Sequence, residues 1–253
     1  MNKFRLVFLT LIVVSAHPVL NAQTASADEL LRLAEQIIFP SIYRVEMTIT
    51  TVKPGQPESR ISMEIFYKEG AGSFIEMTAP ARSRGIRFLE KEASLSLYNP
   101  KSNSRRPLRL SPEQSFQGTV FSNNDVSNPQ YTDDYEARME NSETIEHPDP
   151  GTVDCLVILA EAKRKEAPYG RIKIWIDKKE LRPLRFDYYA KSGLLFKSMI
   201  LSGYRQMAGK MRPSRMHMDS FEIDGAWSEV SIDSLEALDD IPDSRFSPAA
   251  LTR

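Results

Sequence analysis

Residues 95–126 read LSLYNPKSNSRRPLRLSPEQSFQGTVFSNNDV, and this stretch decides the fold. Two runs typical of strands, 95–98 and 105–110, are separated by a Tyr-Asn-Pro turn and lead into the aromatic motif FQGTVF at residues 116–121. Its glycine, Gly118, either allows a turn with a positive φ or lets the backbone approach a ligand closely, and we favour the turn. The stretch contains no catalytic constellation, so it favours a binding protein.

The chain from residue 43 onward is patterned mainly with the period of two that is typical of β-strands. Short turn signals such as Asn99-Pro100 and Ser192-Gly193 separate the runs, and such connections favour antiparallel neighbours. Residues 123–133 and 147–151 are expected to be loops. The candidate strands are 43–52, 60–68, 73–77, 86–91, 94–98, 105–110, 135–141, 154–162, 171–177, 184–190, 195–202, 214–222 and 228–234.

One amphipathic helix is expected at residues 28–39, DELLRLAEQIIF, before the first strand. A large sheet that is apolar on one face and has one clear helix to cover it must curl on itself. We therefore predict a mainly β fold, an antiparallel, unclosed (half) β-barrel of about 11 strands with a helical lid. The pattern alone leaves a β-sandwich open as an alternative. The lid residues are expected to be Leu30, Leu31, Ala34, Ile37 and Ile38.

Residues 1–22 are expected to be a secretory signal peptide. Lys3 and Arg5 precede an apolar run that is too short to span a bilayer as a helix, and small residues follow it. Cleavage is expected after Ala22, with Ala27 as a second possible site.

The mature chain, 23–253, is expected to be one exported and soluble domain. Its only cysteine, Cys155, lies far from either cleavage site, so no N-terminal lipid anchor is expected. A lone cysteine also excludes an intramolecular disulfide framework, so an ordinary hydrophobic core has to stabilise the chain.

Catalytic and metal-binding motifs are missing, because the sequence has no HExxH, GxSxG, P-loop or CxxC string. The mature chain holds two histidines, His147 in an expected loop and His217 in an expected strand. We therefore predict a protein that is not an enzyme and has no catalytic residue, no metal and no cofactor. A cell-envelope hydrolase that uses His217 stays open as an alternative.

The charge is nearly balanced, with a formal net charge of −1 for the whole chain. Lys101, Arg105, Arg106 and Arg109 crowd one segment, which is typical of a solvated strand face or a blunted sheet edge, with contact to an anionic head group or a membrane surface as the alternative. The chain lacks the broad basic footprint of a nucleic-acid binder, so no nucleic-acid partner is expected.

Five motifs resemble, in the same order, the outer membrane lipoprotein-sorting (LolA-like) family of periplasmic carriers. They are FQGTVF at 116–121, YGRIKIWID at 169–177, RPLR at 182–185, RPSR at 212–215 and IPDSRFS at 241–247. The resemblance covers roughly residues 60–253. It implies an unclosed antiparallel barrel whose helices form a lid over an apolar cavity. Val120 stands where the family often has an acidic residue, which argues against a polar role for the first motif.

The resemblance implies a soluble, monomeric periplasmic protein that binds the acyl chains of a lipoprotein or a lipid. It would receive this ligand from an inner-membrane transporter and pass it to an outer-membrane acceptor. A structural envelope protein that binds another chain through its sheet edge stays open as a further alternative.

The candidate cavity residues are the aromatic and aliphatic side chains on or beside the expected strands, to which core packing is the competing role. Arg84 and Arg87 are the candidates for the arginine that holds the lid in this family. If the Ile172, Ile174 and Ile176 side lines the interior, Trp175 points outward. The cavity candidates are Phe66, Phe88, Leu97, Phe116, Phe121, Trp175, Phe186, Tyr188, Phe196, Met199, Met216 and Met218.

Overall fold

The computed structural model describes residues 25–253 except residues 93, 105, 128 and 129. The signal peptide expected at residues 1–22 lies outside the described residues. The elements are α1 (Ala27–Ile38), β1 (Ile42–Val52), β2 (Ser59–Lys68), β3 (Gly72–Ala79), β4 (Arg87–Lys91), β5 (Ser94–Tyr98), β6 (Leu108–Leu110), α2 (Asn123–Ser127), β7 (Tyr135–Met139), β8 (Glu143–His147), β9 (Gly151–Ala162), β10 (Arg171–Asp177), β11 (Pro183–Tyr189), β12 (Leu195–Ser202), β13 (Arg205–Met207), β14 (Lys210–Arg212), β15 (Arg215–Ser220), β16 (Trp227–Ala237), the 3-10 helix η1 (Asp243–Phe246) and α3 (Pro248–Thr252).

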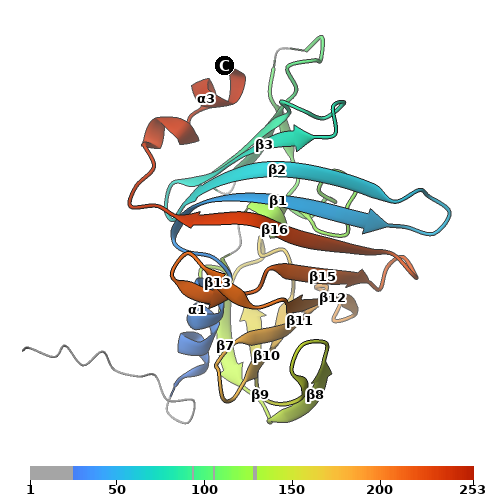
Figure 1. Ribbon diagram of the computed structural model, residues 1–253, viewed down its shortest axis with the longest axis vertical. Coiled ribbons are helices and arrows are strands. Elements are labelled where there is room, and N and C mark those ends of the chain that lie inside the picture. The colour runs from blue at the N-terminus through green and yellow to red at the C-terminus, as the bar shows by residue number, and fades with distance from the viewer. Residues whose placement is uncertain (1–24, 93, 105, 128–129) are drawn as a thin grey trace, which may run out of the picture.

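Fourteen strands form one antiparallel sheet, which curls around the interior of the molecule (Figure 1). Their order is β6-β5-β4-β3-β2-β1-β16-β15-β12-β11-β10-β9-β7, with β8 paired to β9, and β13 and β14 form a separate hairpin. Because the order begins at β6 and ends at β7, the sheet is unclosed. The prediction of a mainly β, antiparallel and unclosed fold is confirmed. A β-sandwich is wrong, because these strands belong to one continuous hydrogen-bonded sheet.

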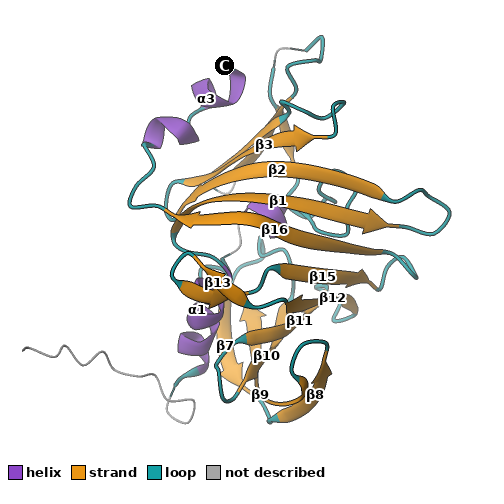
Figure 2. Cartoon of the chain, viewed as in Figure 1, coloured by secondary structure: helices purple, strands orange, loops and turns teal. Residues whose placement is uncertain are grey.

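The sheet has more strands than the predicted eleven or so. Strand β8, ETIEH, has one aliphatic residue, Ile145, among two glutamates, a threonine and a histidine, so it lacks the apolar run that marks a strand. Strands dominate the chain, and the three α-helices are short elements at the margins of the sheet or inside its curve (Figure 2).

Helix α1 begins and ends close to its predicted limits, 28–39. The Ser26 side chain accepts a hydrogen bond from the Glu29 backbone N–H, and the Glu29 carboxylate accepts one from the Ser26 backbone N–H, so the two form a capping box. Pro40 follows its last turn, where a helix commonly stops. The predicted stripe is buried, with Leu30 and Leu31 fully enclosed against the interior of the sheet.

The inner face of the sheet carries the main hydrophobic core, because alternate residues of each strand point inward. In β1 and β2, Val45 and Met47 lie opposite Ile65 and Met63, and all four are buried. On the far side of the curve, β10 contributes the predicted Ile172, Ile174 and Ile176 series to the same core.

The C-terminal segment covers part of the outer face. Phe246 of η1 and Leu251 of α3 pack on Phe74 and Leu89, which point outward from β3 and β4. The Lys68 ammonium holds the segment through the carboxylates of Asp240 and Asp243, each 2.8 Å away. This outer cluster is separate from the interior core.

Candidate ligand-binding interior

A cavity of about 40 Å³ lies inside the curve of the sheet. Four methionines form much of its wall, Met47 from β1, Met199 from β12, and Met216 and Met218 from β15. A water molecule occupies about 30 Å³ in the liquid, whereas small-molecule pockets span about 300 to 1,000 Å³. The interior is therefore nearly filled. Its other lining residues are Ile38, Phe39, Tyr43, Phe121, Asp125, Val126, Tyr131, Tyr188 and Val230.

Most of the predicted cavity residues lie in or against the interior core, and five of them line the cavity itself. Those five are Phe121, Tyr188, Met199, Met216 and Met218. Packed in or against the core but away from the cavity wall are Phe88, Leu97, Phe116, Phe186 and Phe196.

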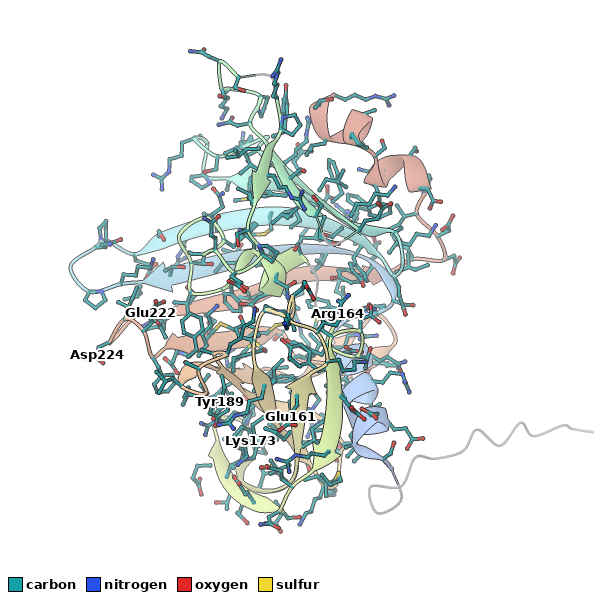
Figure 3. The ribbon with its side chains drawn as sticks, turned by 180° about the vertical axis from the view of Figure 1, so that it is seen from behind. Glu161, Arg164, Lys173, Tyr189, Glu222 and Asp224 are labelled. Atoms are coloured by element: carbon teal, nitrogen blue, oxygen red, sulfur yellow. The ribbon has the colours of Figure 1, made fainter. Side chains whose placement is uncertain are left out.

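Phe66 and Trp175 are corrections, since both lie on the outer face. Phe66 alternates with the inward Ile65 and stacks on the Arg245 guanidinium, 4.0 Å from its ring centre. The Trp175 indole N–H donates to the Glu143 carboxylate at 2.8 Å, and the ring lies between Lys173 and Arg185. Lys173, which lies on β10, is labelled in Figure 3. The outward direction of Trp175 is the one expected if the isoleucines of β10 line the interior.

Polar contacts fix α1 at both ends. The Asp28 carboxylate accepts from the Ala137 backbone N–H of β7 at 2.8 Å, and the Glu35 carboxylate accepts from the backbone N–H groups of Tyr131 and Thr132. At the C-terminal end, the buried Arg212 guanidinium donates to the carbonyls of Gln36 and Ile37, at 2.6 and 3.0 Å. Burial raises the pKa of Glu35 and lowers the pKa of Arg212.

The arginine that contacts α1 is therefore Arg212, and the prediction of Arg84 and Arg87 is wrong. Arg84 donates to the Thr78 carbonyl, while Arg87 pairs with Glu76 and the backbone carbonyl of Arg253 on the outer side. The signal for Arg212 was present in the RPSR motif, which opens with this residue. It was missed because nothing in the sequence shows which arginine reaches the end of a distant helix.

A second element, residues 111–127, enters the curve of the sheet, and we name it the inner cover. Its FQGTVF motif turns back on itself, with φ of 49° at Gln117 and 82° at Gly118, and the Phe116 N–H donates to the Phe121 carbonyl at 2.8 Å. Gly118 therefore serves a turn. The Val120 N–H then donates to the Ser228 hydroxyl at 2.9 Å, which attaches the motif to β16.

The inner cover ends in α2, whose Asp125 forms a buried ion pair with Lys197 of β12. The Lys197 ammonium lies 3.2 Å from Asp125 Oδ2, which also accepts from the Ser122 N–H at 2.7 Å. Asp125 Oδ1 accepts from the Tyr169 hydroxyl at 2.7 Å. Lys197 is not among the predicted site residues, although its spacing of two from Met199 places it on the same strand face.

Two surface pockets flank the cavity. One, of about 350 Å³, is lined by Glu35, Tyr67 and Arg212 among others, and it shares Phe39 with the cavity. The other, of about 200 Å³, is lined by Tyr169, Phe196 and Lys197 among others. Phe39 and the Lys197–Asp125 pair therefore separate the interior from the surface on two sides.

His217 lies on the outer face, between the inward Met216 and Met218. Its ring nitrogens face two carboxylates, Asp219 at 3.3 Å and Glu229 at 3.6 Å, and its ring stacks with Trp227. These contacts tie neighbouring strands together. Across the part of the chain that the structure describes, no three His, Cys, Asp or Glu side chains are grouped so that they could hold a metal ion.

Among the described residues, no helix combines the length and the apolar character that crossing a membrane requires.

Comparison with known proteins assigns the chain to a family. A family model described as "-like: Uncharacterized protein" matches residues 69–253. No curated protein matches the chain significantly in sequence.

Three solved structures share the fold over most of their length. A LolA superfamily protein from Nitrosomonas europaea, NE2245, is 26% identical, with a TM-score of 0.80 over 90% of this chain and 100% of that one. A DUF1329 family protein from Desulfovibrio piger is 23% identical, with a TM-score of 0.76 over 89% and 97% of the two chains. A structure from Vibrio parahaemolyticus, described as a candidate outer membrane lipoprotein-sorting protein domain, is 21% identical, with a TM-score of 0.74 over 92% and 100%.

The similarity to the structures from Desulfovibrio piger and Vibrio parahaemolyticus is a similarity of fold. Together with the first structure, these two confirm the resemblance that the sequence motifs indicated. The chain therefore belongs to the family that the matching model describes, and it has the fold of the LolA superfamily.

Proposed function

We propose that the protein is a periplasmic carrier that holds the acyl chains of a lipoprotein or a lipid inside its curved sheet. The observation that carries this proposal is the wall of four methionines beneath two separate covers, α1 and the inner cover. Methionine is unbranched and polarisable, so such a wall can repack around chains of irregular shape. The similar structure from Vibrio parahaemolyticus is the one described in terms of lipoprotein sorting.

Loading has to enlarge the cavity. The present 40 Å³ is far below the several hundred Å³ of a typical ligand pocket, so an acyl chain can enter only if a cover moves. The structure then corresponds to a closed form of the carrier.

Transfer needs no bond chemistry. Burying about 14 methylenes is worth roughly 11 kcal/mol relative to water, but a chain that starts in a membrane already has this benefit. The net transfer free energy is therefore near zero. Direction has to come from partners, which we propose to be an inner-membrane transporter as donor and an outer-membrane protein as acceptor, with the carrier itself a monomer.

We propose export through the signal peptide, with a mature chain that begins at Gln23. Ser26 caps α1 and Ala27 is buried within its first turn, so a cut after Ala27 would remove the cap. Loss of such a cap typically costs about 1 kcal/mol, which favours the cut after Ala22. We propose that residues 23–253 form one domain.

The test is to isolate the mature protein from the periplasm and identify extracted lipids by mass spectrometry. A carrier is expected to yield acylated molecules in a stoichiometric amount. Fluorescent acyl probes should then bind the lipid-free protein with saturation. A protein that contains no lipid and binds no probe would contradict the proposal.

The small cavity favours one alternative, a structural envelope protein with a permanently filled interior. That protein would bind no acyl probe. A hydrolase receives no such support, since His217 faces two carboxylates on the outer side of the sheet.

A further inference from the structure

Lys197 is an unusual residue on the inward, largely apolar face of the sheet. It belongs to β12, where Met199 and Leu201 are the next inward residues, and only 6% of its side chain is exposed. The rings of Phe196 and Tyr169 lie 5.2 and 5.7 Å from its ammonium. Taking a charge out of water into such surroundings is unfavourable unless an opposite charge compensates it. The sheet therefore carries a fixed cation that requires an anion.

The compensating anion comes from the inner cover. Asp125 belongs to α2, and the Ser122 N–H of the same segment holds its carboxylate. If the inner cover moves to admit a ligand, Asp125 moves with it. Lys197 then loses its counter-charge and keeps the neutral Tyr169 hydroxyl, 3.3 Å from its ammonium, while the Tyr169 hydroxyl loses the Asp125 acceptor. An acyl chain without a charged group restores neither the counter-charge nor this acceptor, whereas an anionic amphiphile restores both.

The position of the pair fits an amphiphile. Lys197 and Tyr169 line the surface pocket of about 200 Å³, while Asp125 lines the methionine-walled cavity. Lys197 Nζ and Asp125 Oδ2 are 3.2 Å apart, so the two spaces meet at the ion pair. A head group at the place of Asp125 would have solvent on the pocket side and the methionines on the other side, where a tail would extend.

We propose that Lys197 and Tyr169 bind the anionic head group of an acylated ligand, a carboxylate or a phosphate, and that Asp125 occupies the place of this group in the closed protein. This inference rests on the proposed carrier function and specifies the chemistry of its ligand. It makes the inner cover a competitor that an acidic lipid displaces and a neutral lipid does not.

The experiment compares a fluorescent fatty acid that has a free carboxylate, its methyl ester and a monoacyl phosphate with the same chain. Binding is measured with the lipid-free mature protein. The acid is expected to bind roughly tenfold more tightly than the ester, in line with a charge-assisted hydrogen bond. The relative affinity of the acid and the acyl phosphate identifies the preferred head group.

Two variants test the assigned residues. The double variant Lys197→Met with Asp125→Asn removes both charges without leaving one buried alone, and it is expected to bind acid and ester equally. Asp125→Asn alone weakens the internal competitor, so its affinity for the acid should rise. Lys173→Met is the matched control, because Lys173 pairs with Glu143 on the outer face, and the preference for the acid should stay unchanged.

The outcomes separate this inference from the function on which it rests. If wild-type protein binds acid and ester equally, the head-group site is wrong while the carrier function stands. The same holds if the double variant keeps the preference for the acid. If no acyl probe binds, the carrier function itself fails and the inference fails with it.

Discussion

α1 and the inner cover close the same interior, but different kinds of contact hold them. α1 buries a continuous apolar stripe, and most of its polar contacts, apart from the one between the Thr132 hydroxyl and Glu35, run between side chains and backbone groups. The inner cover also buries apolar side chains, but three of its polar contacts to the rest of the protein end on side chains, those of Ser228, Lys197 and Tyr169. A ligand can replace side-chain partners more readily than it can replace the backbone contacts that end a helix. We therefore expect the inner cover to open and α1 to stay in place.

Two engineered disulfides give the largest expected effect. A cysteine pair at Val120 and Ser228 ties the inner cover to β16, where backbone nitrogen and hydroxyl are 2.9 Å apart, and it should abolish binding of an acyl probe until it is reduced. A pair at Asp28 and Ala137 ties α1 to β7 and should leave binding intact. The buried Cys155 should not interfere.

The disulfide pair at α1 also tests the lid that the sequence predicted. If it blocks loading and the pair at the inner cover does not, α1 is the gate and the comparison is reversed. Probe titrations of the oxidised and reduced forms of both variants decide between the two covers.

Truncation of buried side chains should separate the covers by stability. Leu31→Ala in α1 is expected to cost about 2 to 5 kcal/mol, because the residue is fully enclosed and leaves a cavity. Val126→Ala in α2 should cost roughly 1 to 2 kcal/mol, since fewer carbon atoms are lost. Urea unfolding followed by circular dichroism measures both. Equal losses would show that the two elements are equally integral to the folded protein.

Glu35 of α1 should make the stability of the protein depend on pH. Burial raises the pKa of this carboxyl above its ordinary value of 4.5, so the folded protein binds its proton more tightly than the unfolded chain does. The stabilisation from Glu35 is therefore fully present below pH 4.5 and is lost as the pH rises through the raised value. Glu35→Gln should flatten this fall in urea unfolding measured across that range.

Glu29, at the other end of the same helix, is the control for the direction in which stability changes with pH. Hydrogen bonding to the Ser26 backbone lowers the pKa of Glu29, so its contribution is lost as the pH falls. Glu29→Gln should therefore change the pH dependence in the opposite direction. A steeper loss of stability toward high pH in Glu35→Gln than in the wild type would contradict the assignment.

The smallest expected effect concerns tryptophan fluorescence. In Trp227→Phe, Trp175 is the only tryptophan left, and it lies on the outer face against Glu143 and Lys173. Binding of an acyl probe inside the sheet should leave its emission unchanged. A clear shift would place the ligand, or a movement that it causes, at the outer face.

The sequence predicted the parts of the fold that repeat. Alternation along Ile172, Ile174 and Ile176 identified an inward face, and the spacing of Leu30, Leu31 and Ala34 identified α1, because both patterns come from local geometry. The turn at Gly118 was also predictable from a single residue type. Family motifs then supplied the unclosed barrel, which the alternation alone could not distinguish from a sandwich.

The candidate site was less predictable, because it depends on contacts between distant segments. Arg212 reaches α1 only after the chain has passed through thirteen further strands, and Asp125 lies in a segment that was expected to be a loop. The prediction of Phe66 as a cavity residue is wrong because its neighbour Ile65 points inward, so Phe66 points to the opposite face. An aromatic residue in a strand is expected to be buried, but its residue type does not tell which face of the sheet it lies on. The C-terminal segment that covers Phe66 has no repeating apolar pattern, so the sequence does not predict that it packs on the outer face.

The two edge strands of the sheet affect how readily copies of the protein aggregate. An unclosed sheet presents unpaired backbone at its first and last strands, which is a template for strand addition and aggregation. Here β6 is three residues long with Arg109 at its centre, and β7 carries the charged Glu136 and Arg138, while Asp28 takes up its Ala137 N–H. Short, charged edges of this kind discourage a neighbouring chain from pairing. If the interior opens as proposed, these edges should keep neighbouring copies from polymerising by strand addition.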